Sequence, residues 1–269
     1  LIREFALSPE GSRVAAVVGT LGEIRVYDIP GDEVTVYSLG ADGETVVSHE
    51  LPDPLDRGRE PAIATLGVVH LTWSPDGRRL ALSRAESSGK ASLALLKVDT
   101  GELVGVASFL NSTAPHVAWS PDGESLVLMH TPITAGGLFG NTQFIRLMAE
   151  QDGAELSSGE IVRPVGYRTE PANLVAVEGL DRFIFNWEHG LWQLTATEGD
   201  LAGARVWRVT RDAMTVPYVL PSVAPSLDAA VFLVQDDAGL HIGVRKDLAS
   251  ETCTLYEQTQ GNQGDQEAR

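Results

Sequence analysis

Cysteine is almost absent from the sequence, which contains Cys253 alone among 269 residues. A single cysteine excludes a disulfide within the chain and a zinc site built from cysteines. No apolar run reaches the roughly 18 residues that a membrane-spanning helix needs, so no membrane insertion is predicted. The chain starts at Leu1 inside a strand-like pattern, without a signal-peptide leader, and we expect it to be a fragment of a longer protein.

Positive charge is also scarce. The sequence holds 20 lysines and arginines against 37 acidic residues, and its formal net charge is −17. No basic cluster interrupts this acidic balance. Because such a charge repels phosphate backbones and anionic lipid surfaces, a nucleic-acid partner is not predicted.

The familiar catalytic motifs are missing. No serine stands in a Gly-x-Ser-x-Gly context, no His-Glu-x-x-His pattern occurs, and Cys253 lies in a polar stretch. The glycine-rich residues 131–141 match no phosphate-binding pattern. We therefore predict no catalytic residue and no cofactor, and expect that the chain is not an enzyme by itself.

A repeated motif is the main positive signal. Residues 5–11, 71–77 and 117–123 align without gaps, and the last two contain Trp-Ser-Pro-Asp-Gly. A weaker copy lies at residues 223–229, and a further unit is expected at residues 174–181, where Asp181 takes the place of the motif aspartate. Repeats of about 40–50 residues are typical of propeller blades, so five units account for this length of chain.

The residues of the motif explain its local structure. Proline presets the second position of a type I turn, aspartate suits the third, and glycine follows where φ is positive. Around residues 71–77, short runs rich in valine and leucine predict four strands, at residues 68–73, 79–83, 91–98 and 103–109. These runs lack helical periodicity, which indicates an all-β fold.

The Trp-Ser-Pro-Asp-Gly repeats resemble those of TolB-type β-propellers, and also those of the propellers of prolyl oligopeptidase relatives. The resemblance covers nearly the whole chain and implies a β-propeller of four-stranded antiparallel blades with five recognisable repeats. Because family members have six or more blades, we expect a fragment of a larger propeller. Residues 1–256 form the predicted domain, with an insertion at residues 40–67 in the first blade, and residues 257–269 are predicted to be a disordered polar tail.

Three polar residues share one position in the repeat. Glu4, His70 and His116 each stand four residues before the motif serine, near the start of a predicted innermost strand. Equivalent positions on successive blades point toward the same rim of a central channel, so these side chains are candidates for binding a small polar ligand or a metal ion. The alternative is a set of hydrated channel residues without a ligand, because the inner strands of adjacent blades are expected to lie well apart.

Two loops are further candidates for protein contacts. Residues 131–141 carry three glycines around Leu138 and Phe139, which predicts a mobile loop with an apolar tip. Residues 40–67 are rich in proline and charge, and are either a solvated loop or an arm that contacts a partner.

The sequence favours a non-catalytic scaffold that binds a protein partner or a ligand, and the resemblance implies a bacterial, extracytoplasmic protein, either periplasmic or secreted or anchored as a lipoprotein. The first alternative is the substrate-gating propeller of a prolyl-oligopeptidase-type serine peptidase, with its catalytic domain outside this chain. A second alternative is a propeller enzyme with a metal held by Glu4, His70 and His116.

Overall fold

The chain consists of β-strands, turns and loops in the part that the structure describes. The computed structural model describes residues 2–18, 23–39, 45–48, 66–86, 89–149, 153–163, 169–177, 182–188, 190–208, 218–223, 229–236, 239–246 and 257–258. No helix in these residues is long and apolar enough to cross a membrane. The predicted all-β class is confirmed.

The strands form five sheets that follow one another along the chain. The first sheet contains β1 (Ile2–Leu7), β2 (Arg13–Val18), β3 (Glu23–Asp28), β4 (Glu33–Leu39) and β5 (Thr45–Ser48). The second contains β6 (Leu66–Trp73), β7 (Arg79–Glu86), β8 (Lys90–Lys97) and β9 (Leu103–Leu110), and the third contains β10 (His116–Trp119), β11 (Ser125–His130), β12 (Thr142–Met148) and β13 (Glu155–Ile161). The fourth contains β14 (Ala172–Val177), β15 (Arg182–Trp187), β16 (Gly190–Thr197), β17 (Asp200–Arg208) and β21 (Glu257–Gln258), and the fifth contains β18 (Tyr218–Val223), β19 (Ala229–Asp236) and β20 (Gly239–Lys246).

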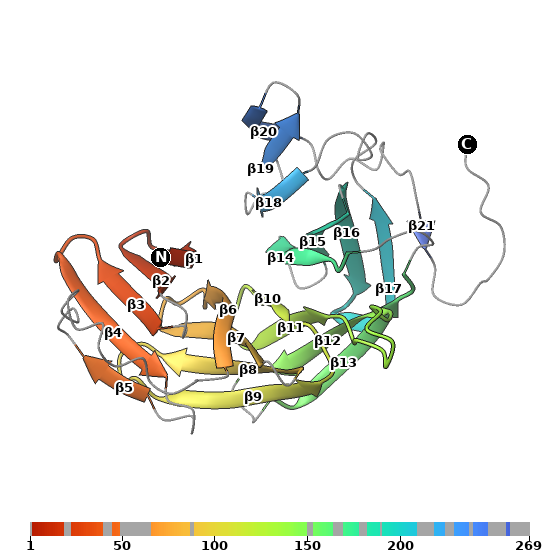
Figure 1. Ribbon diagram of the computed structural model, residues 1–269. Helices are drawn as coiled ribbons and strands as arrows, with labels where there is room; N and C mark the ends of the chain where they lie inside the picture. Colours follow the sequence, from red (N-terminus) through yellow and green to blue (C-terminus); the bar gives the residue numbers. More distant parts are fainter. Residues whose placement is uncertain are drawn as a thin grey trace.

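Each sheet is an antiparallel blade in which strands that are neighbours in sequence are neighbours in space. Figure 1 shows the blades side by side along an arc, with β1, β6, β10, β14 and β18 toward its inner side. Each of these inner strands contacts the next one along the chain. The arrangement confirms the predicted propeller blades.

The repeated motif forms the turn between the first two strands of a blade. In the second blade, Gly77 has a φ of 69° and its N–H donates to the Ser74 carbonyl at 2.9 Å. The Ser74 hydroxyl accepts the Arg79 N–H at 2.9 Å and donates to Asp76 Oδ1 at 2.5 Å. The third blade repeats these contacts, so the motif serine and aspartate stabilise the turn.

The motif tryptophans pack between blades. Trp73 and Trp119 are each 6% exposed. The indole N–H of Trp73 donates to the Ala6 carbonyl at 3.0 Å, and that of Trp119 donates to the Thr72 carbonyl at 3.3 Å. Each indole therefore reaches back to the inner strand of the preceding blade.

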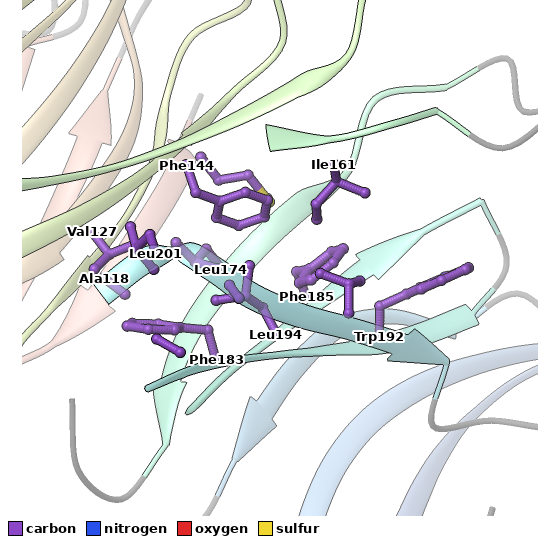
Figure 2. Packing of buried hydrophobic residues seen from close by; sticks show 14 of the residues in the cluster. Ala118, Val127, Phe144, Ile161, Leu174, Phe183, Phe185, Trp192, Leu194 and Leu201 are labelled. Atoms are coloured by element: carbon purple, nitrogen blue, oxygen red, sulfur yellow. The ribbon is translucent and has the colours of Figure 1, made fainter. Parts of the chain in front are cut away.

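The largest buried cluster joins the third and fourth blades. Figure 2 shows Phe144 and Ile161 on one side of this cluster and Phe185 and Trp192 on the other. The rings of Phe144 and Phe185 are 5.8 Å apart between centroids and tilted by 56°, a favourable geometry for aromatic pairs. Packing of this kind fixes the position of the third blade relative to the fourth.

Parts of the predicted outline differ from the structure. The insertion expected at residues 40–67 includes strand β5, which pairs with β4, and the first two residues of β6. Val36 to Leu39 of β4 leave an outer edge whose backbone groups can pair with a fifth strand, and β5 occupies it. The remainder of the insertion lies outside the described residues.

The expected tail and the two weaker repeats lie only partly within the described residues. Residues 257 and 258, at the start of the predicted disordered tail, form strand β21 against β17. The rest of that tail lies outside the described residues. Residues 174–177 of the unit expected at residues 174–181 lie in β14, whereas residues 178–181, with Asp181, and the motif residues at 224–228 lie outside the described residues.

Candidate functional site

Glu4, His70 and His116 meet at the inner side of the blades. The His70 Nδ1 lies 3.0 Å from Glu4 Oε2, and the rings of His70 and His116 are 4.0 Å apart between centroids. The second carboxylate oxygen of Glu4 accepts the Leu71 N–H at 3.3 Å. The inner strands of adjacent blades were expected to lie well apart, but β6 contacts both β1 and β10, and these three side chains meet between the strands. We call this cluster, together with Asn173, the mouth.

Asn173 of β14 is the fourth member of the mouth. The hairpin of the second blade closes with Ser74 bonded to Arg79, and that of the fourth blade closes with Val177 opposite Arg182. Asn173 therefore stands four residues before the equivalent of the motif serine. The alignment based on Asp181 places this unit two residues too late, so sequence reasoning missed it. No sequence motif marks this position, because only the register of the hairpin defines it.

The pairing between the first two strands of the blade is irregular beside three of the four residues of the mouth. The register between the first two strands shifts at Ile2/Glu4 in the first blade, at Val68/His70 in the second and at Ala172/Val175 in the fourth. β-Bulges of this kind re-aim side chains and are frequent beside binding sites. Asn173 lies inside its bulge with a φ of 57°, a conformation that asparagine tolerates better than most residues.

One hydrogen bond and the burial of the side chain determine the protonation state of His116. Its Nδ1 lies 3.2 Å from the Asn173 N–H and accepts that proton, so the imidazole proton is on Nε2. Burial, and in second place the neighbouring His70, hold the pKa of His116 well below its usual value. At neutral pH the imidazole is therefore uncharged and can donate from Nε2.

The mouth opens into a cavity of about 370 Å³. Its walls come from the inner strands of the first four blades, with Thr72 among their residues, and from Ala81 of β7. Ser83 lies opposite His70 in the pairing of β6 with β7, two residues beyond Ala81, and so shares the face that lines the cavity. The Ser83 hydroxyl is fully buried and has no hydrogen-bond partner among the described residues.

Glu170 brings a second carboxylate to the region of the mouth. Its side chain interacts electrostatically with His70 and hydrogen-bonds with Thr113. Burial raises the pKa of this carboxyl group above its usual value, against the opposing effects of Thr113, His70 and Arg163. Its Oε2 is buried and has no hydrogen-bond partner in the part of the chain that the structure describes.

A metal ion is a poor fit to this geometry. Within the described ranges, no three histidine, cysteine, aspartate or glutamate side chains are grouped so that they could hold a metal. The Nδ1 atoms of His70 and His116 face Glu4 and the Asn173 N–H respectively, so neither is directed at a shared point. Donors and acceptors for a polar ligand are what the mouth provides.

A serine–histidine pair exists elsewhere in the third blade. The Ser112 hydroxyl lies 2.8 Å from His130 Nδ1, and the His130 ring packs 4.2 Å from that of Phe109 between centroids. Ser112 and His130 are 6% and 7% exposed, and burial lowers the pKa of His130 to about 4. Because the pair is closed to solvent, it serves packing rather than nucleophilic catalysis.

The two residues of the predicted apolar loop tip differ in their surroundings. Leu138 is 71% exposed, but the ring of Phe139 lies under the guanidinium of Arg163 at 5.2 Å. The segment forms a hydrogen-bonded hairpin, in which the Thr134 N–H donates to the Leu138 carbonyl at 2.8 Å. Leu138 alone of the two predicted residues is free to contact a partner through most of its side chain.

Comparison with known proteins identifies the fold of the chain, but it finds no relative by sequence. No protein-family model and no curated protein matches the sequence. Among solved structures, that of a putative TolB from Agrobacterium tumefaciens is 16% identical, with a TM-score of 0.57 over 96% of this chain and 80% of the other. TolB from Acinetobacter baumannii is 13% identical, with a TM-score of 0.53 over 91% of this chain and 50% of the other. The chain has the TolB-type β-propeller fold.

The same propeller fold also appears within larger enzymes. Prolyl oligopeptidase B from Galerina marginata is 14% identical, with a TM-score of 0.53 over 96% of this chain and 34% of that protein. Such identities establish the shared arrangement of blades and leave the function to be argued from the mouth.

Proposed function

We propose that this propeller is a non-catalytic scaffold that binds a segment of a protein partner at the mouth. The observation that carries the proposal is the convergence of polar side chains from four blades on one cavity of about 370 Å³. A cavity with a few convergent polar groups is the usual form of a specific binding site. Its size suits one side chain or a short stretch of peptide.

The chemistry of the mouth supports binding over catalysis. His116 is a neutral hydrogen-bond donor, Glu4 is an acceptor, and His70 lies between them. In the part of the mouth that the structure describes, no hydroxyl or thiol is hydrogen-bonded to either imidazole, as an activated nucleophile would be. These groups orient a ligand without attacking it.

The location and partner class are part of the proposal. The similarity to TolB structures supports a bacterial, extracytoplasmic protein that works through protein contacts. The exposed Leu138 offers a second contact beyond the mouth.

Site-specific photo-crosslinking tests this function. A photoreactive amino acid replaces Thr72, at the wall of the cavity, in the full-length protein expressed in its native cells. We expect one protein adduct, identified by mass spectrometry, that disappears when His116 is also replaced by leucine. The same photoreactive residue at Thr100, in the turn between β8 and β9, is the matched control and should give no such adduct. Identical adducts from both positions would refute the mouth as the binding site.

A substrate-gating propeller in a serine peptidase is the second candidate. The similarity to prolyl oligopeptidase B, of which this chain spans 34%, favours it. A fluorophosphonate probe, which labels active-site serines, applied to the full-length gene product distinguishes the two functions. Covalent labelling of the full-length product would favour the peptidase, and its absence alongside a specific crosslink would favour the scaffold.

A further inference from the structure

We propose that the mouth recognises a positively charged group of its partner, either the ammonium or guanidinium of a basic side chain or the free amino terminus of a peptide. This inference rests on the proposed function and specifies its ligand. It follows from the charges that face the mouth, the hydrogen-bonding atoms that remain available there, and the size of the cavity.

Two carboxylates act on the same imidazole at the mouth. Glu4 contacts His70 directly at 3.0 Å, whereas Glu170 interacts with His70 electrostatically. Both carboxylates therefore act on His70. Two carboxylates in a partly buried region favour a cation near them, because each carboxylate loses hydration and gains a charged hydrogen-bond donor.

The cationic groups of the protein do not saturate these carboxylates. His116 is uncharged at neutral pH because of its buried position. Arg163 attracts Glu170 electrostatically, but its guanidinium lies over the Phe139 and Trp187 rings and donates to the Thr169 carbonyl at 2.6 Å. Oε2 of Glu170 is buried and accepts no hydrogen bond from a described residue, so its hydrogen-bonding capacity is not satisfied by them.

Ser83 is an independent sign that a polar group enters the cavity. Its hydroxyl is fully buried and lacks a hydrogen-bond partner among the described residues, and the residue lies opposite the cavity-lining His70 in the pairing of β6 with β7. Leaving a buried hydroxyl unpaired costs roughly 1–3 kcal/mol, so such groups usually have a partner. A lysine or arginine head group carries several N–H donors and can satisfy a hydroxyl and a carboxylate together.

Charge over the whole chain supports the same ligand. A net charge of −17 attracts a basic segment and repels an acidic one, which raises the rate of productive encounters. A cavity of about 370 Å³ is large enough for one long basic side chain and its head group. A partner with an exposed lysine, arginine or amino terminus therefore fits the mouth in both charge and size.

Short peptides test the inference with the purified protein. The probes are three tripeptides blocked at both ends, with lysine, arginine or norleucine in the centre, and one tri-alanine peptide with a free amino terminus. Calorimetric titration at low salt should show binding of at least one charged peptide at least tenfold tighter than that of the norleucine peptide. The blocked basic peptides and the free-terminus peptide distinguish the two sources of positive charge. Norleucine binding as tight as that of every charged peptide would overturn the inference.

Charge-removing variants locate the binding. Glu4→Gln and Glu170→Gln should each weaken binding of the charged peptide about tenfold, since each removes one charged hydrogen bond. Glu102→Gln removes the same charge from an exposed ion pair with Lys97 and is the matched control. Circular dichroism and thermal unfolding check that each variant is folded. Because Glu4→Gln and Glu170→Gln are separate variants, each one tests the cation site without the other.

The outcomes separate this inference from the proposed function. If the photo-crosslink to a protein partner forms but survives unchanged in both Glu4→Gln and Glu170→Gln, the scaffold function stands and charge recognition is refuted. If no specific crosslink forms while the charged peptides bind in a Glu4-dependent way, the scaffold function fails and the cation site stands. Equal binding by the wild type and both folded variants refutes the cation site.

Discussion

The guanidinium of Arg79 lies 5.0 Å above the ring of Trp119 in the next blade, and its NH2 donates to the Gly123 carbonyl at 2.8 Å. Arg13 repeats the relationship one blade earlier, 5.0 Å above Trp73 and 2.8 Å from the Gly77 carbonyl. The first residue of the second strand thus holds the motif turn and tryptophan of the following blade. Because the same contact recurs, it is part of how adjacent blades are fixed together.

Removing this arginine should loosen the second and third blades. Arg79→Leu removes the stacking over Trp119 and the hydrogen bond to Gly123, and we expect a loss of about 1–2 kcal/mol in the free energy of unfolding. Arg78→Leu changes the adjacent, exposed arginine and should cost less than about 0.5 kcal/mol. Denaturant unfolding measures both, and equal effects would contradict the contact's proposed role.

A methyl group at Gly159 should separate the third blade from the fourth. A Cβ at this position would lie 2.1 Å from the Leu201 carbonyl oxygen in β17, which is too close for any non-bonded contact. We expect Gly159→Ala to destabilise the protein by about 3 kcal/mol, because two backbones must move apart. Gly105→Ala, in a strand where nothing lies within 4 Å of the new Cβ, is the control and should have little effect. Thermal unfolding of the two variants decides the question.

The motif turn should depend on its serine and aspartate together. The Ser120 hydroxyl accepts the Ser125 N–H at 2.9 Å and donates to Asp122 Oδ1 at 2.5 Å, and this hydrogen bond lowers the pKa of the Asp122 carboxyl group. Ser120→Ala should cost about 1–3 kcal/mol, since a buried N–H loses its acceptor. In a double-mutant cycle with Asp122→Ala, the two losses should be less than additive. Additive losses would show that the two side chains act independently.

Mild acid should destabilise the fold through its buried histidines. Burial lowers the pKa of His130 to about 4 and that of His116 well below its usual value of 6.5. Below about pH 6.5 the unfolded chain binds protons that the folded chain does not, so stability falls as the pH decreases toward 4. Each histidine contributes at most about 1.4 kcal/mol for each pH unit.

Denaturant unfolding at pH 7 and pH 5 measures this loss. The variant His130→Asn, which cannot titrate, should show a smaller difference between the two pH values than the wild type. An unchanged difference would mean that His130 is already protonated in the folded protein, or that it does not contribute to the acid sensitivity.

Much of the fold follows from local chemistry that the sequence displays. Proline and glycine at fixed places around Ser74 and Ser120 specify the turn, and the flanking runs of valine and leucine specify the strands. The shared position of Glu4, His70 and His116 in the repeat was enough to predict that they face one rim. Their direct contact was not predictable, because it depends on distances between sheets.

The remaining features depend on register and long-range packing. Asn173 was missed because the fourth hairpin lacks the serine and proline that mark the turn elsewhere. Strand β21 was missed because a polar segment can complete the exposed edge of β17 by backbone hydrogen bonds alone. The buried Oε2 of Glu170 and the hydroxyl of Ser83 are revealed only when neighbouring blades enclose them.

Because its side chains come from the inner strands of separate blades, the mouth exists only when four sheets hold their spacing at once. A small slip between two neighbouring sheets would disperse the cluster while leaving every strand paired within its own sheet. Loss of ligand affinity should therefore precede loss of circular dichroism during gradual denaturation. Binding at the mouth would then report on the alignment of the blades more sensitively than any measure of secondary structure.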